Sequence, residues 1–134
     1  MDGRFLLAIA AAFVTSFVLS FVFHGLILAN EYNTLLAVYR GPQFRPTTFA
    51  VLVLAQVLMA AAMVTVYCYG RQERPFLAQG VRFGLMAAGL SVIPHYMINY
   101  AVTNIPAALA VEQIALETVK VVAMGIVVAW FYRQ

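Results

Sequence analysis

Charge and cysteine are both scarce in this sequence. Only 10% of its 134 residues are charged, whereas 64% are hydrophobic. A soluble domain carries about 25% charged residues, and one small core could not bury this much apolar surface. The chain is therefore expected to have lipid as its solvent. The single Cys68 excludes an internal disulfide and a zinc site of the multi-cysteine kind.

Signatures of catalysis and of nucleic-acid binding are also missing. The sequence has no phosphate-binding glycine loop, no G-x-S-x-G elbow and no zincin motif, so a lone chain is not expected to be an enzyme. Its eight Lys and Arg and five Asp and Glu are too few and too scattered for the phosphate contacts of a nucleic-acid interface. No nucleic-acid partner is expected.

Four long apolar stretches dominate the chain, at about 5–28, 49–69, 80–102 and 107–131. Each is close to the roughly 20 residues that cross a hydrocarbon core as a helix, and isolated strands could not satisfy their backbone groups there. The first stretch is longer than the 7–15-residue core of a signal peptide, which indicates a retained span. The sequence predicts an all-α, polytopic membrane protein, with one four-transmembrane-helix domain over residues 1–134.

The distribution of arginine predicts the orientation of these spans. Cytoplasmic loops carry the excess of Lys and Arg, and five arginines fall on one side of the predicted spans against two on the other. The larger group is Arg4, Arg71, Arg74, Arg82 and Arg133, and the smaller is Arg40 and Arg45. Both termini are therefore expected in the cytoplasm.

Shorter features complete the predicted architecture. Residues Asn33 to Arg40 form an amphipathic stretch that predicts a short interfacial helix in the first outer loop, broken by Gly41-Pro42. Small residues four apart predict close helix contacts. These pairs are Gly84 with Ala88 and Gly125 with Ala129.

Ionisable residues inside the last apolar stretch are the strongest functional signal. Gln113, Glu117 and Lys120 share one helix face, and Glu112 lies on its flank. A charge at the bilayer centre costs about 2.5–3.5 kcal/mol on insertion scales, so it persists where it is paired, enclosed or functional. Three interpretations remain open: an internal Glu117–Lys120 ion pair, a proton, ion or substrate site, and a contact with another subunit.

Two other stretches carry polar residues that are expected at the same depth. In the third stretch, Pro94 predicts a kink, and His95 and Asn99 share a face; the simplest interpretation is that His95 hydrogen-bonds a carboxylate. In the first stretch, Ser16, Ser20 and His24 form a stripe whose serines are expected to bond their own backbone. The predicted polar cluster comprises His24, His95, Asn99, Glu112, Gln113, Glu117 and Lys120.

The chemistry of this cluster leaves its ligand open. Two histidines and a carboxylate can bind Zn, Cu or Fe, which makes His24, His95 and Glu112 the metal candidates. No helix, however, has a tight two-ligand motif such as His-x-x-x-His. No cofactor is predicted, and contact with lipid or a quinone remains open.

Two segments carry a resemblance to known proteins. They are Phe23-His24-Gly25-Leu26-Ile27-Leu28-Ala29-Asn30-Glu31-Tyr32 and Pro94-His95-Tyr96-Met97-Ile98-Asn99-Tyr100-Ala101-Val102. With a glycine-rich start to the third stretch, they resemble a group of small, uncharacterised four-helix bacterial membrane proteins. The resemblance implies a four-helix bundle in a bacterial inner membrane, and it implies no particular activity.

Three functional hypotheses follow. The favoured one is a non-catalytic accessory or assembly subunit of a larger membrane complex, with lipids and other membrane subunits, or further copies of itself, as partners. The second is a small homo-oligomeric transporter or channel that uses the polar cluster. The third is a membrane protein that binds a metal, a lipid or a quinone.

Overall fold

The fold is a bundle of four long helices, which confirms the predicted all-α architecture. The computed structural model describes residues 2–40 and 45–133. Four helical segments in this part of the chain are long and apolar enough to cross a membrane. They are Gly3–Ile27, Pro46–Gly70, Phe76–Val102 and Ala107–Phe131. The protein is thus a multi-pass membrane protein, and the predicted spans agree with these bounds to within a few residues.

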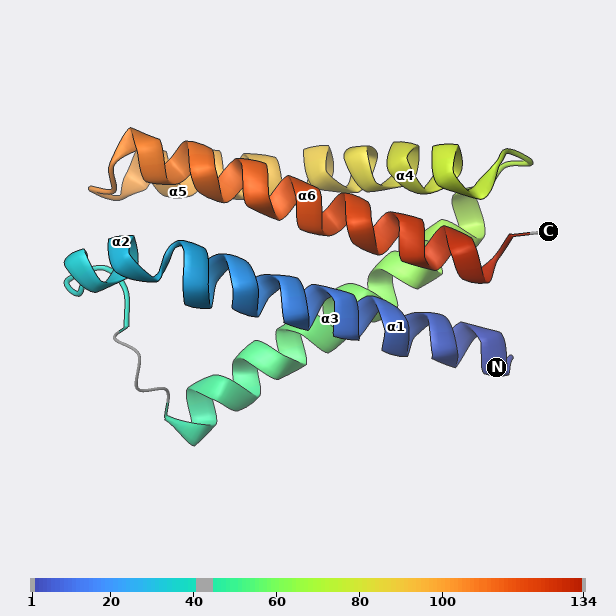
Figure 1. The fold of residues 1–134 in the computed structure, drawn as a ribbon, viewed down its shortest axis with the longest axis horizontal. Coiled ribbons are helices and arrows are strands. Elements are labelled where there is room, and N and C mark those ends of the chain that lie inside the picture. Colours follow the sequence, from blue (N-terminus) through green and yellow to red (C-terminus); the bar gives the residue numbers. More distant parts are fainter. Residues whose placement is uncertain (1, 41–44, 134) are drawn as a thin grey trace.

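Both chain termini lie at one end of the bundle, beside the link between the second and third spans (Figure 1). We call this the termini end. The opposite end carries the short helix α2 (Ala29–Thr34) and the turn between the third and fourth spans, and we call it the α2 end. This placement of elements alternates along the chain, as expected for four successive crossings.

The first span changes its helical form before it ends. Helix α1 (Gly3–Ser20) continues into a π-helical segment, η1 (Phe21–Ile27), in which the Leu28 N–H donates to the Phe23 carbonyl five residues earlier. Such π-helical turns often occur at functional sites. After a break at Leu28, the chain turns into α2.

The short helix lies earlier in the chain than predicted. It spans Ala29–Thr34 rather than Asn33 to Arg40, and the residues after Leu35 form turns, with the Val38 and Tyr39 N–H groups donating to the Leu35 carbonyl. The helix follows the end of the π-helical segment directly, a local feature that amphipathic spacing does not reveal. The predicted break at Gly41-Pro42 lies outside the described residues.

The third span is interrupted about one turn before Pro94. It consists of α4 (Phe76–Leu90) and α5 (Val92–Val102), separated at Ser91. Pro94 has no N–H to donate to the carbonyl four residues before it, which is that of Leu90. The missing hydrogen bond therefore leaves the helix interrupted one turn upstream, at Ser91, whose hydroxyl donates to the Ala87 carbonyl at 2.6 Å.

Glycines bring α4 and α6 (Ala107–Phe131) into backbone contact. A Cβ added to Gly84 would lie 2.5 Å from Val122 Cα, and one added to Gly125 would lie 2.5 Å from the Gly80 carbonyl oxygen. No side chain fits in these spaces, so only glycine permits this approach. The two predicted small-residue pairs do lie in this part of the bundle, since Ala88 and Ala129 are fully buried.

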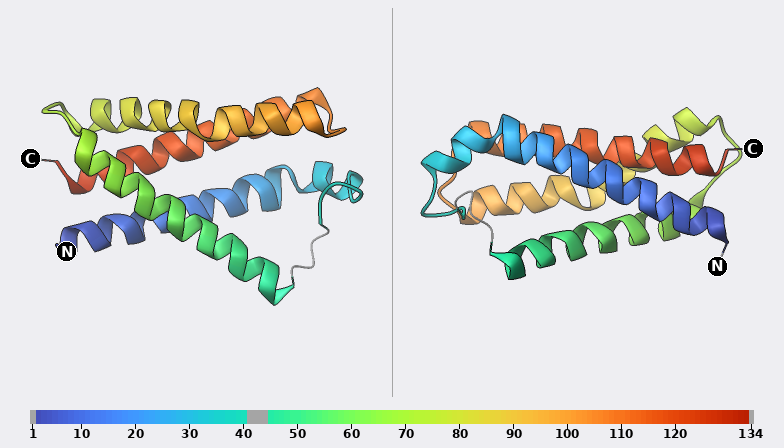
Figure 2. Two further views of the ribbon diagram at one scale, coloured as in Figure 1. Left: turned by 180° about the vertical axis from the view of Figure 1, so that it is seen from behind. Right: turned by 60° about the horizontal axis from the view of Figure 1, so that its bottom comes forward.

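Helix α3 (Pro46–Gly70) is the least integrated span. It packs mainly on α1, makes few contacts with α6 and makes at most marginal contacts with α4 and α5. Figure 2 shows α3 crossing α1 obliquely, so that its Pro46 end stands apart from α4, α5 and α6. Its sequence is apolar on all sides, which suits a helix with lipid over most of its surface.

Candidate functional site

Buried polar side chains gather where α1, η1 and α6 meet. Ser16, Gln113, Glu117 and Lys120 each expose 4% or less of their surface. All three of the α6 residues share one face of that helix, as their spacing of four and three predicts. This face is turned toward α1 and η1, and the candidate site is built on it.

Glu117 lies at the centre of the site, with both carboxylate oxygens occupied. Its Oε2 is 2.6 Å from Lys120 Nζ, and its Oε1 is 2.7 Å from His24 Nε2. The His24 side chain is 27% exposed, whereas the carboxylate and the ammonium are each 5% exposed. Removing one member would leave a buried charge without its partner, which is the costly case for enclosed ion pairs.

His24 extends the site to α2 through its other ring nitrogen. Its Nδ1 is 2.6 Å from the Tyr32 hydroxyl. Residues eight apart in a straight α-helix are separated by about 12 Å along the axis. The direct bond therefore depends on the π-helical segment and the break at Leu28, which turn the chain back on itself.

Hydrogen bonds connect Gln113, Tyr32, His24 and Glu117. Burial raises the pKa of Tyr32 to about 12, so its hydroxyl stays protonated at neutral pH. That hydroxyl accepts from Gln113 Nε2 at 3.1 Å and can donate its own proton to His24 Nδ1. His24 Nε2 donates to Glu117 Oε1, because a carboxylate can only accept, so Tyr32, His24 and Glu117 form one chain of hydrogen bonds. Gln113 Nε2 also donates to the Tyr39 hydroxyl, at 3.3 Å.

Lys120 extends the site in the other direction, to α3. Its Nζ donates to Ser20 Oγ at 3.1 Å, and Gln56 Nε2 donates to the same oxygen at 3.0 Å. The Ser16 hydroxyl in turn donates to Gln56 Oε1. Gln56 thus links α3 to the rest of the bundle through hydrogen bonds. We call the connected set the polar network: Ser16, Ser20, His24, Tyr32, Tyr39, Gln56, Gln113, Glu117 and Lys120.

Two acceptor oxygens at the α2 end of the site have no partner within residues 2–40 and 45–133. They are Gln113 Oε1 and Glu31 Oε2, and both atoms are buried. An enclosed acceptor without a hydrogen bond is unfavourable. The capacity for further hydrogen bonds therefore lies beside Tyr32 and α2, not at Glu117.

The structure brings together four of the seven residues in the predicted cluster. His24, Gln113, Glu117 and Lys120 belong to the polar network. His95 and Glu112 are exposed, and Asn99 is half-buried; no hydrogen bond from any of these three side chains is found in the described part of the chain. The expectation that His95 bonds a carboxylate is wrong, because His95 faces outward and His24 makes that contact instead.

Sequence reasoning also misjudged several members of the network. Ser16 and Ser20 were expected to bond their own backbone, yet both bond Gln56. Tyr32 and Tyr39 were not singled out. The sequence does place both tyrosines shortly after His24, but this proximity points to the site only if the chain turns back at Leu28, as the structure shows.

The metal candidates do not form a set. Within the described ranges, no three His, Cys, Asp or Glu side chains are placed to hold one ion. His24 is engaged by Tyr32 and Glu117, while His95 and Glu112 lie on outer surfaces.

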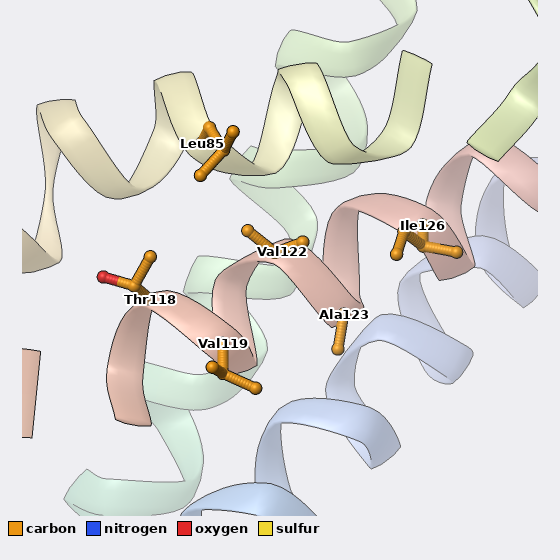
Figure 3. Close-up of a pocket in the computed structure, with 6 residues that line it drawn as sticks. All are labelled: Leu85, Thr118, Val119, Val122, Ala123 and Ile126. Carbon is orange, nitrogen blue, oxygen red and sulfur yellow. The ribbon is translucent and has the colours of Figure 1, made fainter. Parts of the chain in front are cut away.

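The outer face of α4 and α6 carries a shallow groove of about 390 Å³ (Figure 3). Its lining is almost wholly apolar: Leu85, Thr118, Val119, Val122, Ala123 and Ile126. The one polar side chain in this lining is that of Thr118, whose hydroxyl is buried and has no hydrogen-bond partner among the described residues. In a membrane protein, such a surface is suited to lipid chains or a neighbouring helix, and it offers no acid or base. The polar network therefore remains the candidate site.

The resemblance to small four-helix bacterial membrane proteins implied a bundle of four helices, and the structure confirms four long apolar helices. A scan against protein-family models, a search of curated proteins and a search of solved structures each returned no match.

Proposed function

We propose that this membrane protein is a non-catalytic accessory or assembly subunit of a larger complex in the bacterial inner membrane, with both termini cytoplasmic. One observation carries the proposal: two ionisable side chains, His95 and Glu112, lie on the outside of membrane-spanning helices. The orientation is supported by the arginine excess near the termini end.

The depth of these side chains makes their exposure unfavourable in lipid. Spans of 25 and 27 residues are about 38–40 Å long and extend some 4–5 Å beyond each side of a 30 Å hydrocarbon core. Glu112 lies about 7 Å, and His95 about 10 Å, from the nearer end of its helix. Both therefore lie a few ångströms inside the core, where a polar partner would stabilise them.

The polar network supports the same function by fixing the shape that would dock. It joins α1, η1, α2, α3 and α6, and both oxygens of Glu117 are already engaged inside it. Helix α3 offers additional surface because most of its length is covered only by α1. The buried polar network sets the geometry, and the exposed His95 and Glu112 side chains select the partner.

Extraction into a gentle detergent or a polymer nanodisc tests this proposal. The chain is expected in a particle much larger than its monomer, and Glu112→Gln or His95→Ala should shift it to smaller species. Asp2→Asn is the matched control, because Asp2 is also an exposed acid but lies outside the four spans. Recovery of the parent chain only as a free monomer would refute the proposal, as would an equal effect of the control.

The second candidate is a small homo-oligomeric proton carrier, favoured by the arrangement of Tyr32, His24 and Glu117. If His24 gained a proton at Nδ1, that N–H could donate to the Tyr32 oxygen, and the Tyr32 hydroxyl could turn to the free Gln113 Oε1. The network could thus accept and release a proton without moving the backbone.

Proton flux in liposomes discriminates the two candidates. A carrier should lose flux in Glu117→Gln and in Tyr32→Phe, the second of which interrupts the chain of bonds while leaving the buried charges in place. Glu112→Gln should retain flux, because Glu112 lies outside the network. An absence of flux in the parent protein would eliminate the carrier, whereas the subunit hypothesis predicts that absence.

A further inference from the structure

A second polar feature lies at the termini end, opposite α2. The end of α3, the link to α4, and the end of α6 surround a hollow of about 600 Å³. It is lined by Tyr67, Arg71, Gln72, Glu73, Arg74, Pro75, Phe76, Ala129, Tyr132 and Arg133. Arg71 and Arg74 both lie in the link between α3 and α4, and the fold brings Arg133, which follows α6, to the same hollow.

The lining of this hollow is basic. It contains three arginines and one acid, Glu73, so its formal charge is three minus one, or +2. None of the three guanidinium groups forms an ion pair with another residue of the described chain. Arg71 lies over the Tyr132 ring at 5.6 Å, and Arg133 lies over the Trp130 ring at 4.5 Å. Stacking of this kind holds a guanidinium in place while its N–H donors stay free.

Two further groups of donors face the same region. Helix α4 begins at Phe76, directly after Pro75, and no side chain caps its first N–H groups. The N-terminus of a helix favours an anion. Arg82 donates to Gln72 Oε1 at 2.6 Å, which holds the Gln72 oxygen and leaves its amide N–H₂ free to donate.

The apolar part of the lining distinguishes the hollow from a simple charged surface. Tyr67 is buried and its ring packs edge-on against Phe83 at 5.1 Å, while Ala129 is fully buried. The hollow therefore combines an apolar floor, continuous with the spans, and a basic rim at the helix ends. This is the chemistry of a phosphate-bearing headgroup whose acyl chains remain in the bilayer.

We propose that this hollow binds the phosphate group of an anionic membrane lipid. Arg71, Arg74 and Arg133 supply forked donors that match phosphate oxygens. The source is a lipid rather than a soluble phosphate because the site lies where three membrane spans end and where Trp130 and Tyr132 suit the headgroup layer. Membrane proteins bind acidic lipids in basic pockets of this kind between helices.

Thermal unfolding in a neutral detergent, with added phosphatidylglycerol or phosphatidylcholine, tests the proposal. Phosphatidylglycerol should raise the unfolding midpoint saturably, and phosphatidylcholine should not. The double variant Arg71→Gln/Arg74→Gln should weaken the apparent affinity by about 30-fold, at roughly five-fold for each arginine near the surface. The control Arg40→Gln/Arg45→Gln removes the same charge from exposed positions outside the hollow and should retain full affinity.

A parallel titration with inorganic phosphate separates the two sources of the group. If the lipid is the ligand, millimolar phosphate should not reproduce the stabilisation. Stabilisation by phosphate alone, lost in the same double variant, would overturn the lipid assignment. Equal responses to the two lipids would overturn the site itself, as would an equal loss of affinity in the Arg40/Arg45 control. Because stability is compared within each variant with and without lipid, a variant that folds less well still gives a valid result.

Discussion

The buried pair of Glu117 and Lys120 should behave as one energetic unit. We consider Glu117→Gln, Lys120→Met and the double variant. Each single change leaves one charge enclosed without its partner, which typically costs about 3–5 kcal/mol. The double variant removes both charges and should cost far less than the sum of the two single changes. Two unit charges about 4 Å apart attract by about 4 kcal/mol at an effective dielectric constant of about 20, so the coupling energy should be of that order.

The two single variants should also differ from each other. In Lys120→Met, Glu117 keeps the hydrogen bond from His24 Nε2, at 2.7 Å. In Glu117→Gln, the Lys120 ammonium is left among the described residues with neutral acceptors, which are the new amide oxygen and the Ser20 hydroxyl, at 3.1 Å. We therefore expect Glu117→Gln to be the more destabilising change. Adding His24→Ala to Lys120→Met should remove most of that difference.

Unfolding in mixed micelles of a mild detergent and SDS provides the measurement. Cys68 is the only thiol in the chain and is half-buried, so its labelling rate reports opening of the bundle. The double-mutant cycle then gives the coupling energy directly. If the costs of the two single variants simply add in the double variant, the ion pair does not contribute as reasoned here.

Two further predictions concern other parts of the fold. Gly84→Ala should destabilise the bundle by about 1–3 kcal/mol, because the new methyl group would meet the α6 backbone. The control is Gly89→Ala, where a Cβ meets nothing within 4 Å, and this variant should be neutral or stabilising by up to about 1 kcal/mol. Equal effects of the two variants on SDS unfolding would contradict the close contact between α4 and α6. Burial raises the pKa of Tyr32 from 10.0 to about 12. The contribution of Tyr32 to the free energy of unfolding is therefore complete below pH 10 and decreases as the pH rises toward 12, by at most about 2.7 kcal/mol. Unfolding followed by circular dichroism should show that Tyr32→Phe loses less stability over this pH range than the parent protein. An identical loss in the two proteins would rule out the buried environment assigned to the Tyr32 hydroxyl.

The spans were predictable because membrane helices must be long and apolar regardless of their neighbours. The rotation of each helix was not predictable from length and hydropathy. His95 and His24 are both histidines within apolar stretches, yet one faces outward and the other contacts Glu117, 93 residues away in sequence. Depth along the helix axis placed both histidines in the same half of the bundle as Glu117, whereas the direction in which each side chain leaves its helix decided which one reached Glu117.

Local irregularities account for the remaining differences. The π-helical segment and the break at Leu28 bring Tyr32 beside His24. No proline marks either feature, and the lone Gly25 inside an apolar helix does not by itself predict a π-helical turn. On α6, by contrast, the spacing of Gln113, Glu117 and Lys120 was sufficient, because regular helical geometry alone places them on one face. Prediction succeeded where one helix determined the outcome and failed where two had to meet.

The glycine contact between α4 and α6 has a mechanical consequence. Backbones in direct contact at Gly80, Gly84 and Gly125 interlock and resist both sliding and separation. The polar network, by contrast, is held by side-chain hydrogen bonds that can exchange with water when they open. Helices α4 and α6 therefore form one stiff unit, and a force applied between the spans would separate α1 or α3 from that unit before it separated α4 from α6.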